Sequence, residues 1–206
     1  MKKTQKIRKF LKIEKINKIH KLADFTKILQ KTQKKFTDEL FLPNSSSLFN
    51  NQKKPKHPLW SSISFLRLSS LFSSPPPLQD SSNSSLFPTS FLQHKYLFSA
   101  FFAISQRKRI LRKIFEDQKF NEKGVYYAKI CQNGQWTHII LDDFLPCIRT
   151  AQGFSHAFMQ TTGAFWPLLL EKAFAKIYHS YESLEFGDSI EVLRDLTGFF
   201  RISRIF

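Results

Sequence analysis

The densest hydrophobic pattern in the chain lies between residues 165 and 184. Apolar side chains recur there three and four positions apart, which is the spacing of one broad face of an amphipathic helix. They are Trp166, Leu169, Leu170, Ala173, Phe174, Ile177, Tyr178, Tyr181 and Leu184. The positions between them include Glu171, Lys172, Lys176 and Glu182. The pattern therefore predicts a long helix over 165–184, with these charged side chains on its polar face.

Two runs rich in β-branched and aromatic residues precede this helix, at 124–132 and 135–141. Asn133-Gly134 separates them, and this dipeptide readily adopts the positive φ angles of a tight hairpin turn. The pattern predicts a β-hairpin. The next residues, Asp142 to Pro146, interrupt it because proline fixes φ and biases its predecessor away from helix. We expect Asp142 and Asp143 to be an exposed acidic pair in a turn.

The first 35 residues combine a different pattern with most of the charge. Apolar residues recur at every third position from Ile7 to Ile28, so on a helix they wind around the axis and form no single face. Lysine dominates, the only acidic residues are Glu14 and Asp24, and the whole chain has a net charge of +16. We expect a solvated, partly helical arm. The alternative is contact with an anionic membrane or with nucleic acid.

Serine, proline and phenylalanine dominate residues 45–90, and low complexity of this kind does not favour a packed core. No apolar run reaches the roughly 18 to 20 residues that span a bilayer. The lysine-rich arm also lacks the apolar centre of a secretory signal. We therefore expect an intracellular location, cytoplasmic by default.

Several short motifs occur in a distinctive order. They are Gly124-Val-Tyr-Tyr, Gly134-Gln-Trp, Asp142-Asp-Phe-Leu-Pro, Phe165-Trp-Pro-Leu-Leu-Leu-Glu-Lys-Ala-Phe-Ala-Lys, Ser180-Tyr-Glu-Ser-Leu and Leu196-Thr-Gly. This succession resembles the protease core of the calpain family, which are papain-like cysteine proteases. The stretch from Phe36 to Phe49 resembles the opening of calpain cores. The resemblance runs from about residue 36 to about residue 200.

The resemblance implies an α+β fold, a partial papain-like protease core with a central helix, a β-hairpin and a long helix. The family's catalytic histidine and asparagine belong to a second subdomain, which we expect to be missing because the chain ends at Phe206. The expected organisation is a basic arm at 1–35, a degenerate start of the calpain domain at 36–95, and a truncated protease subdomain at 96–206.

The resemblance also locates the nucleophile. Tyr96 to Ser105 resembles the helix that follows the nucleophilic cysteine, which puts Lys95 at the nucleophile position. The family's reaction needs a thiolate there, and lysine does not supply one. The only cysteines are Cys131 and Cys147. A displaced pair of Cys147 with His156 is one hypothesis, but ordinary packing or a solvent-facing thiol is favoured.

Calcium is the cofactor of the family, and typical calpain cores hold it partly through a glutamate directly before the Phe-Trp pair. Here that position is Ala164. Because calcium prefers several oxygen ligands, including carboxylates, we expect this site to be weakened or lost. No cofactor is expected for this chain.

Three functions follow from these observations. The first is a calpain-type, calcium-dependent cysteine endopeptidase acting on protein substrates, although this chain is expected to be inactive. The second is a non-catalytic calpain-like protein that binds or regulates a protein partner. The third is a protein whose basic arm binds a membrane surface or nucleic acid. The missing cysteine has two explanations: a diverged pseudoprotease, or a shifted reading frame over residues 45–95.

Overall fold

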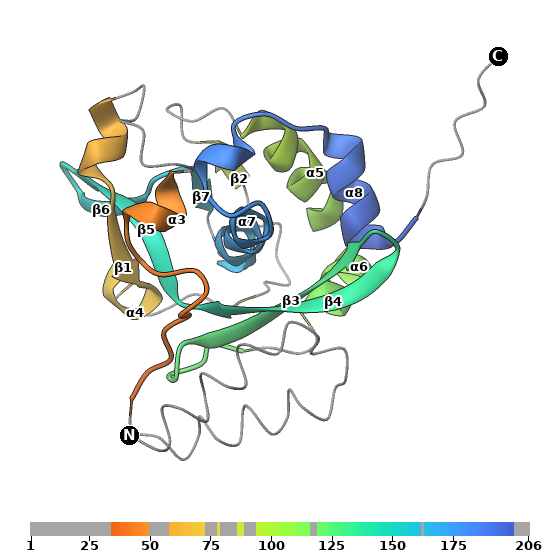
Figure 1. Ribbon diagram of the computed structural model, residues 1–206, viewed down its shortest axis with the longest axis horizontal. Helices are drawn as coiled ribbons and strands as arrows, with labels where there is room; N and C mark the ends of the chain where they lie inside the picture. Colours follow the sequence, from red (N-terminus) through yellow and green to blue (C-terminus); the bar gives the residue numbers. More distant parts are fainter. Residues whose placement is uncertain are drawn as a thin grey trace.

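The computed structural model describes residues 34–49, 58–72, 78, 86–88, 94–115, 119–161 and 163–199 (Figure 1). Nearly all of the basic arm predicted at 1–35 lies outside these residues. The first half of the described chain holds α3 (Ser45–Leu48), a 3-10 turn η1 (Pro58–Ser62), β1 (Ser64–Arg67), α4 (Leu68–Leu71), β2 (Leu86–Pro88), α5 (Lys95–Ser105) and α6 (Lys108–Ile114). The second half holds β3 (Val125–Gln132), β4 (Gln135–Asp142), β5 (Phe144–Thr150), β6 (Gly153–His156), β7 (Met159–Thr161), α7 (Trp166–Ile177), η2 (Glu182–Leu184) and α8 (Ser189–Thr197).

The predicted hairpin is present. β3 and β4 pair antiparallel along their whole length, from Val125 opposite Asp142 to Gln132 opposite Gln135. Asn133 and Gly134 form the turn with φ angles of 49° and 79°. Two successive positive φ angles are what a two-residue hairpin turn requires, and the Asn-Gly dipeptide is the local cause.

The long helix is shorter than the sequence pattern predicts. α7 ends at Ile177, and His179 then adopts a φ of 73°, which breaks the helical path. The chain re-enters the core beyond this bend, where the amide of Tyr181 donates to the carbonyl of Ser47 at 2.9 Å. Tyr181 and Leu184 are therefore buried as predicted, but from a separate turn, η2.

The prediction that this helix has a polar face was wrong. Every residue of α7 from Trp166 to Ala175 is buried, and Glu171 and Lys172 are 0% and 1% exposed. Figure 1 shows the reason: α7 runs through the middle of the molecule, with the β3–β4 hairpin, the strands β5 and β6, and the helices α5 and α8 around it. A helix enclosed in this way has no solvent side along most of its length.

The acidic turn was also predicted wrongly. β5 begins directly after Asp143 and continues through Pro146 to Thr150, at the centre of a three-stranded sheet with the order β1-β5-β6. Asp142 and Asp143 are 0% and 2% exposed. Proline lacks the N–H that a central strand normally donates, and here the Pro146 carbonyl accepts from the amide of Ala157 at 2.8 Å.

Ion pairs explain how these buried charges are tolerated. Lys172 Nζ contacts Asp142 Oδ1 and donates to the carbonyl of Phe144 at 2.5 Å. The other oxygen of Asp142 accepts from the amide of Asp38 at 2.7 Å, and Lys176 Nζ lies 2.5 Å from Asp38 Oδ2. Buried charges persist in proteins when they are paired and hydrogen-bonded in this way.

The neighbouring Asp143 is paired separately. Its carboxylate contacts the guanidinium of Arg67, which also donates to the carbonyl of Phe36 at 2.9 Å. Burial raises the pKa of Asp143, and the Arg67 charge opposes that rise. The segment near Phe36 is thus tied to the corner between β4 and β5. Apolar residues of the predicted low-complexity segment, including Leu48, Trp60 and Leu68, are buried in the same core.

Breaking the central ion pair should destabilise the protein strongly. In Lys172→Met, Asp142 keeps its charge in a buried site without its cation. We expect the free energy of unfolding, measured by urea denaturation, to fall by about 3–5 kcal/mol. The matched control is Lys95→Met at an exposed helical lysine, which should change it by less than about 0.5 kcal/mol. A similar small change in both variants would contradict the role given to Lys172.

Candidate functional site

The site that the sequence singles out is the first residue of α5. Lys95 opens this helix and is exposed to solvent, while Leu97, Phe101 and Ile104 point into the core. The ring of Phe101 lies 6.0 Å from that of Trp166 at the start of α7. α5 is therefore fixed against the buried helix, with its N-terminus at the surface. The first amides of a helix are free of internal partners and form the positive end of its dipole.

The residue just before Lys95 is a buried histidine that contacts a carboxylate. His94 is the N-cap residue of α5, and its Nδ1 lies 2.9 Å from Glu171 Oε1 on α7. Its ring stacks on Phe158, with 5.4 Å between ring centroids. The start of α5 is thus attached to the middle of α7 by a buried histidine–carboxylate contact.

A second histidine approaches the same carboxylate from β6. His156 Nδ1 accepts from the backbone amides of Phe158 at 3.3 Å and Met159 at 3.1 Å. Since Nδ1 is an acceptor, the neutral ring carries its proton on Nε2, which lies 3.7 Å from Glu171 Oε2. Burial lowers the pKa of His156, and the Glu171 charge only partly offsets this effect.

We call His94, Glu171, His156 and Tyr181 the histidine–glutamate cluster. Within the part of the chain that the structure describes, His94 Nε2, His156 Nε2, Glu171 Oε2 and the Tyr181 hydroxyl are buried without a hydrogen-bond partner. Each such group costs about 1–3 kcal/mol. The cluster joins α5, α7, β6 and the segment after α7, so it links the candidate nucleophile position to the rest of the core.

The structure brings the hypothetical pair Cys147 and His156 together. They lie opposite each other in the register of β5 and β6. The thiol is nevertheless unsuited to catalysis: Cys147 is fully buried, its Sγ donates to the carbonyl of Leu145 at 3.2 Å, and burial raises its pKa to about 12. A nucleophilic cysteine needs the opposite environment. Cys131 is also a buried free thiol, within β3.

Ala164 occupies the position at which the resemblance places a calcium-binding glutamate. This side chain is fully buried, and its carbonyl already accepts from the Thr161 hydroxyl at 2.7 Å. A methyl group offers no ligand, whereas calcium prefers several oxygens. No cluster of three or more His, Cys, Asp or Glu side chains suited to a metal occurs among the residues that the structure describes.

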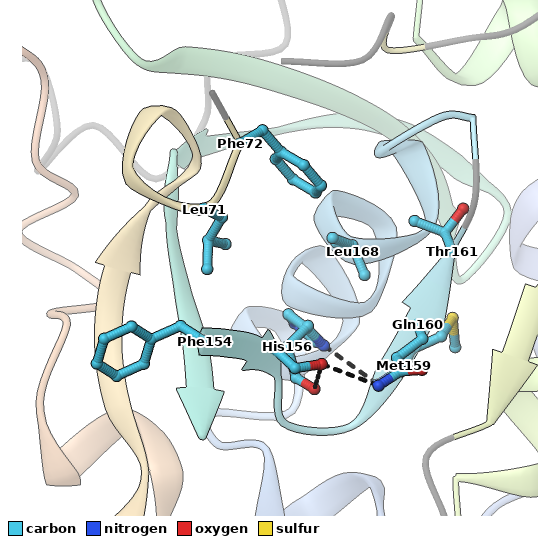
Figure 2. Close-up of a pocket in the computed structure, with 9 residues that line it drawn as sticks. Leu71, Phe72, Phe154, His156, Met159, Gln160, Thr161 and Leu168 are labelled. Carbon is cyan, nitrogen blue, oxygen red and sulfur yellow. Dashed lines mark hydrogen bonds between the residues drawn. The ribbon is translucent and has the colours of Figure 1, made fainter. Parts of the chain in front are cut away.

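A cavity of about 300 Å³ opens elsewhere, between α4, β6, β7 and α7 (Figure 2). Its walls are Leu71, Phe72, Phe154, Ser155, His156, Met159, Gln160, Thr161 and Leu168. Gln160 Nε2 donates to the Ser155 hydroxyl at 2.9 Å across its polar side. No residue of α5 lines it, so this cavity is separate from the surface around Lys95.

Helix α5 with its exposed N-terminus, the buried α7 and the β3–β4 hairpin place the chain among α+β proteins with a partial papain-like protease core. The family model described as "Calpain family cysteine protease" matches residues 36–204. The chain therefore belongs to the calpain family of cysteine proteases, which confirms both the resemblance and the fold class.

Individual calpains are also similar to this chain over most of its length. The chain is 32% identical over 177 residues to calpain-type cysteine protease ADL1 from Oryza sativa subsp. japonica, with 83% of this chain and 8% of that protein covered. It is 31% identical over 170 residues to calpain-10 from Mus musculus, with 79% and 25% covered. Calpain clp-1 from Caenorhabditis elegans is 29% identical over 171 residues, with 82% and 21% covered. The chain thus spans a quarter or less of these relatives' length.

Sequence reasoning missed the buried polar residues of the site. Glu171 and Lys172 were assigned to a solvent face, and His94 was not connected to either of them. One signal was present in the sequence: Glu171 and Lys172 interrupt an otherwise apolar run from Phe165 to Phe174. A helix apolar on nearly all sides is buried, so charges within it require partners.

The His156 environment predicts a pH dependence of stability. Its folded pKa lies below the ordinary 6.5, so below about pH 6.5 the unfolded chain takes up a proton that folded His156 does not. Stability should then fall by up to about 1.4 kcal/mol per pH unit. In His156→Asn, whose side-chain oxygen can replace Nδ1 as acceptor, this loss should be absent.

The measurement is urea denaturation of both proteins at neutral and mildly acidic pH. Comparing the two cancels the titration of other groups, including Asp143. His179→Asn is the matched control, because His179 is exposed and asparagine tolerates its positive φ. This control should keep the wild-type pH dependence. An equal loss in wild type and His156→Asn would contradict the assignment.

Proposed function

We propose that this chain is a non-catalytic calpain-like module, which keeps the scaffold of the protease core and contacts a protein partner without cleaving it. The observation that carries the proposal is Lys95, an exposed ammonium group at the first position of α5. The activity, substrates and partners of the longer relatives belong to those proteins. For this chain they are hypotheses.

The chemistry of the family explains why Lys95 matters. The positive end of a helix dipole stabilises a thiolate, and this lowers the pKa of a cysteine placed there. A protonated lysine at the same point has the opposite charge and no lone pair with which to attack a peptide carbonyl. Neither Cys131 nor Cys147 offers a substitute, since both thiols are buried within strands.

The scaffold itself supports a retained binding role. The ion pairs of Lys172 and Lys176 and the contact between His94 and Glu171 hold α5, α7 and the hairpin in a defined arrangement. Each of these contacts needs both of its partners, because a buried ion pair that loses one partner is strongly destabilising. If the chain had no role as a folded protein, its sequence would not need to supply a partner for each of these buried charges.

The proposal predicts how thiols in the chain react. In folded wild type, neither cysteine should react with iodoacetamide at neutral pH, whereas both should react in denaturant. Lys95→Cys should react about two to five times faster than Ser99→Cys, an exposed control one turn along α5, because the helix dipole stabilises a thiolate at the first position. Mass spectrometry of the labelled chains measures the rates.

Two results would count against the proposal. Equal rates for the two introduced cysteines would mean that the start of α5 does not favour a thiolate. Specific labelling of wild-type Cys131 or Cys147 by a cysteine-protease probe, together with cleavage of a peptide substrate, would mean that the chain is active.

We also propose that this chain does not use calcium through the Ala164 position. Adding calcium at millimolar concentration should leave the Tm unchanged, because a ligand that binds only the folded state raises Tm. Magnesium is the control for general ionic effects. A rise in Tm with calcium alone would show a calcium site that the Ala164 substitution has not removed.

A further inference from the structure

The outward side of α6 carries an unusual concentration of positive charge. Leu111 and Ile114 face the core, whereas the remaining side is exposed and basic. We call its members, together with the residue before the helix, the cationic face: Arg107, Lys108, Arg109, Arg112 and Lys113. α5 and α6 contain no acidic residue.

This arrangement works against the stability of the helix. Lys108 and Arg112 are four residues apart, as are Arg109 and Lys113, and like charges at this spacing repel on a helix surface. Within the described residues, no ion pair is formed by Arg107, Arg109, Arg112 or Lys113, although Lys108 does have an interaction. The core cations Arg67, Lys172 and Lys176 are all paired. Arg107, Arg109, Arg112 and Lys113 are therefore exposed cations without an ion-pair partner among the described residues.

An exposed aromatic side chain lies in the helix that leads into α6. Phe102 is 53% exposed, and its ring stacks on Phe98 of the preceding turn with 6.3 Å between centroids. Phe102 lies five residues before Arg107, the first residue of the cationic face. The two consecutive helices therefore carry both apolar and positively charged exposed groups. Basic residues with adjacent aromatic side chains are typical of surfaces that lie on anionic membranes.

We infer that α5 and α6 form a docking surface for an anionic lipid membrane, with the cationic face on the headgroup phosphates and Phe102 at the acyl boundary. A second copy of the chain is a poor occupant, because it would place two cationic faces together. A basic helix about 10 Å long would also fit the major groove of a nucleic-acid duplex. The exposed Phe102 favours the membrane, because the acyl boundary of a bilayer can bury an apolar side chain.

Vesicle co-sedimentation of the full chain tests this inference. The vesicles contain phosphatidylcholine with about one-third phosphatidylserine, and pure phosphatidylcholine is the reference. Each cation contributes about fivefold to the partition coefficient, so Arg109→Gln/Arg112→Gln should weaken binding by about 25-fold. Phe102→Ser should weaken it by about tenfold. The basic residues of the arm are the same in every variant, so the ratio isolates α6.

The matched control compares two single variants. Arg112→Gln should weaken binding by about fivefold, whereas Arg149→Gln, which removes the same charge from an exposed residue of β5 outside α5 and α6, should weaken it by no more than about twofold. Arg109→Lys/Arg112→Lys keeps the charge and should bind like wild type. Circular dichroism checks that each variant is folded.

Three outcomes would overturn the inference. One is an equal loss in Arg112→Gln and Arg149→Gln, which would indicate general attraction of a basic protein. The second is loss of binding in the lysine double, which would indicate recognition by guanidinium geometry. The third is that Arg109→Gln/Arg112→Gln weakens binding to an oligonucleotide but leaves vesicle binding unchanged. In that case the occupant is nucleic acid. No helix in the described part of the chain is long and apolar enough to cross a bilayer.

Discussion

The pairing of Lys172 with Asp142 is the contact on which the rest of the structure depends. Lys172 lies near the middle of a helix that is buried on all sides, so its charge must be met inside the protein. Asp142 meets it, and its second oxygen fixes the amide of Asp38. Asp38 in turn receives Lys176 from one helical turn further along. A single continuous set of charges therefore joins α7, the end of β4 and the segment near residue 38.

Features that depend on local sequence could be predicted, whereas features that depend on such long-range contacts could not. The hairpin was predictable because Asn133-Gly134 determines the turn locally. The family was recognisable because its motifs keep their order, and the expected nucleophile position at Lys95 rests on the same resemblance. The partners of Asp142, Lys172 and Glu171 were not predictable from periodicity, since they come from distant parts of the chain. The path of the chain after α7 likewise involves a residue far away in sequence, because the Tyr181 amide donates to the Ser47 carbonyl.

In the candidate site, the buried contacts that hold the start of α5 are distinct from the exposed residue at position 95. The start of α5 is held by His94 on Glu171, and His156 approaches the other oxygen of the same carboxylate. These contacts lie behind the surface at which a nucleophile would act. They are made by side chains in the interior, and none of them involves the side chain at position 95. Under the proposed function, the residue at the start of α5, rather than this packing, determines whether the chain carries a nucleophile.

The β3–β4 hairpin has a consequence for how the protein behaves in solution. In the described part of the chain these two strands pair only with each other, so each has an outer edge without a strand neighbour. Such edges are templates for pairing between molecules. The net charge of +16 keeps copies apart at low ionic strength, and added salt screens this repulsion. The same salt that releases a basic protein from anionic surfaces therefore removes its main protection against edge-to-edge association.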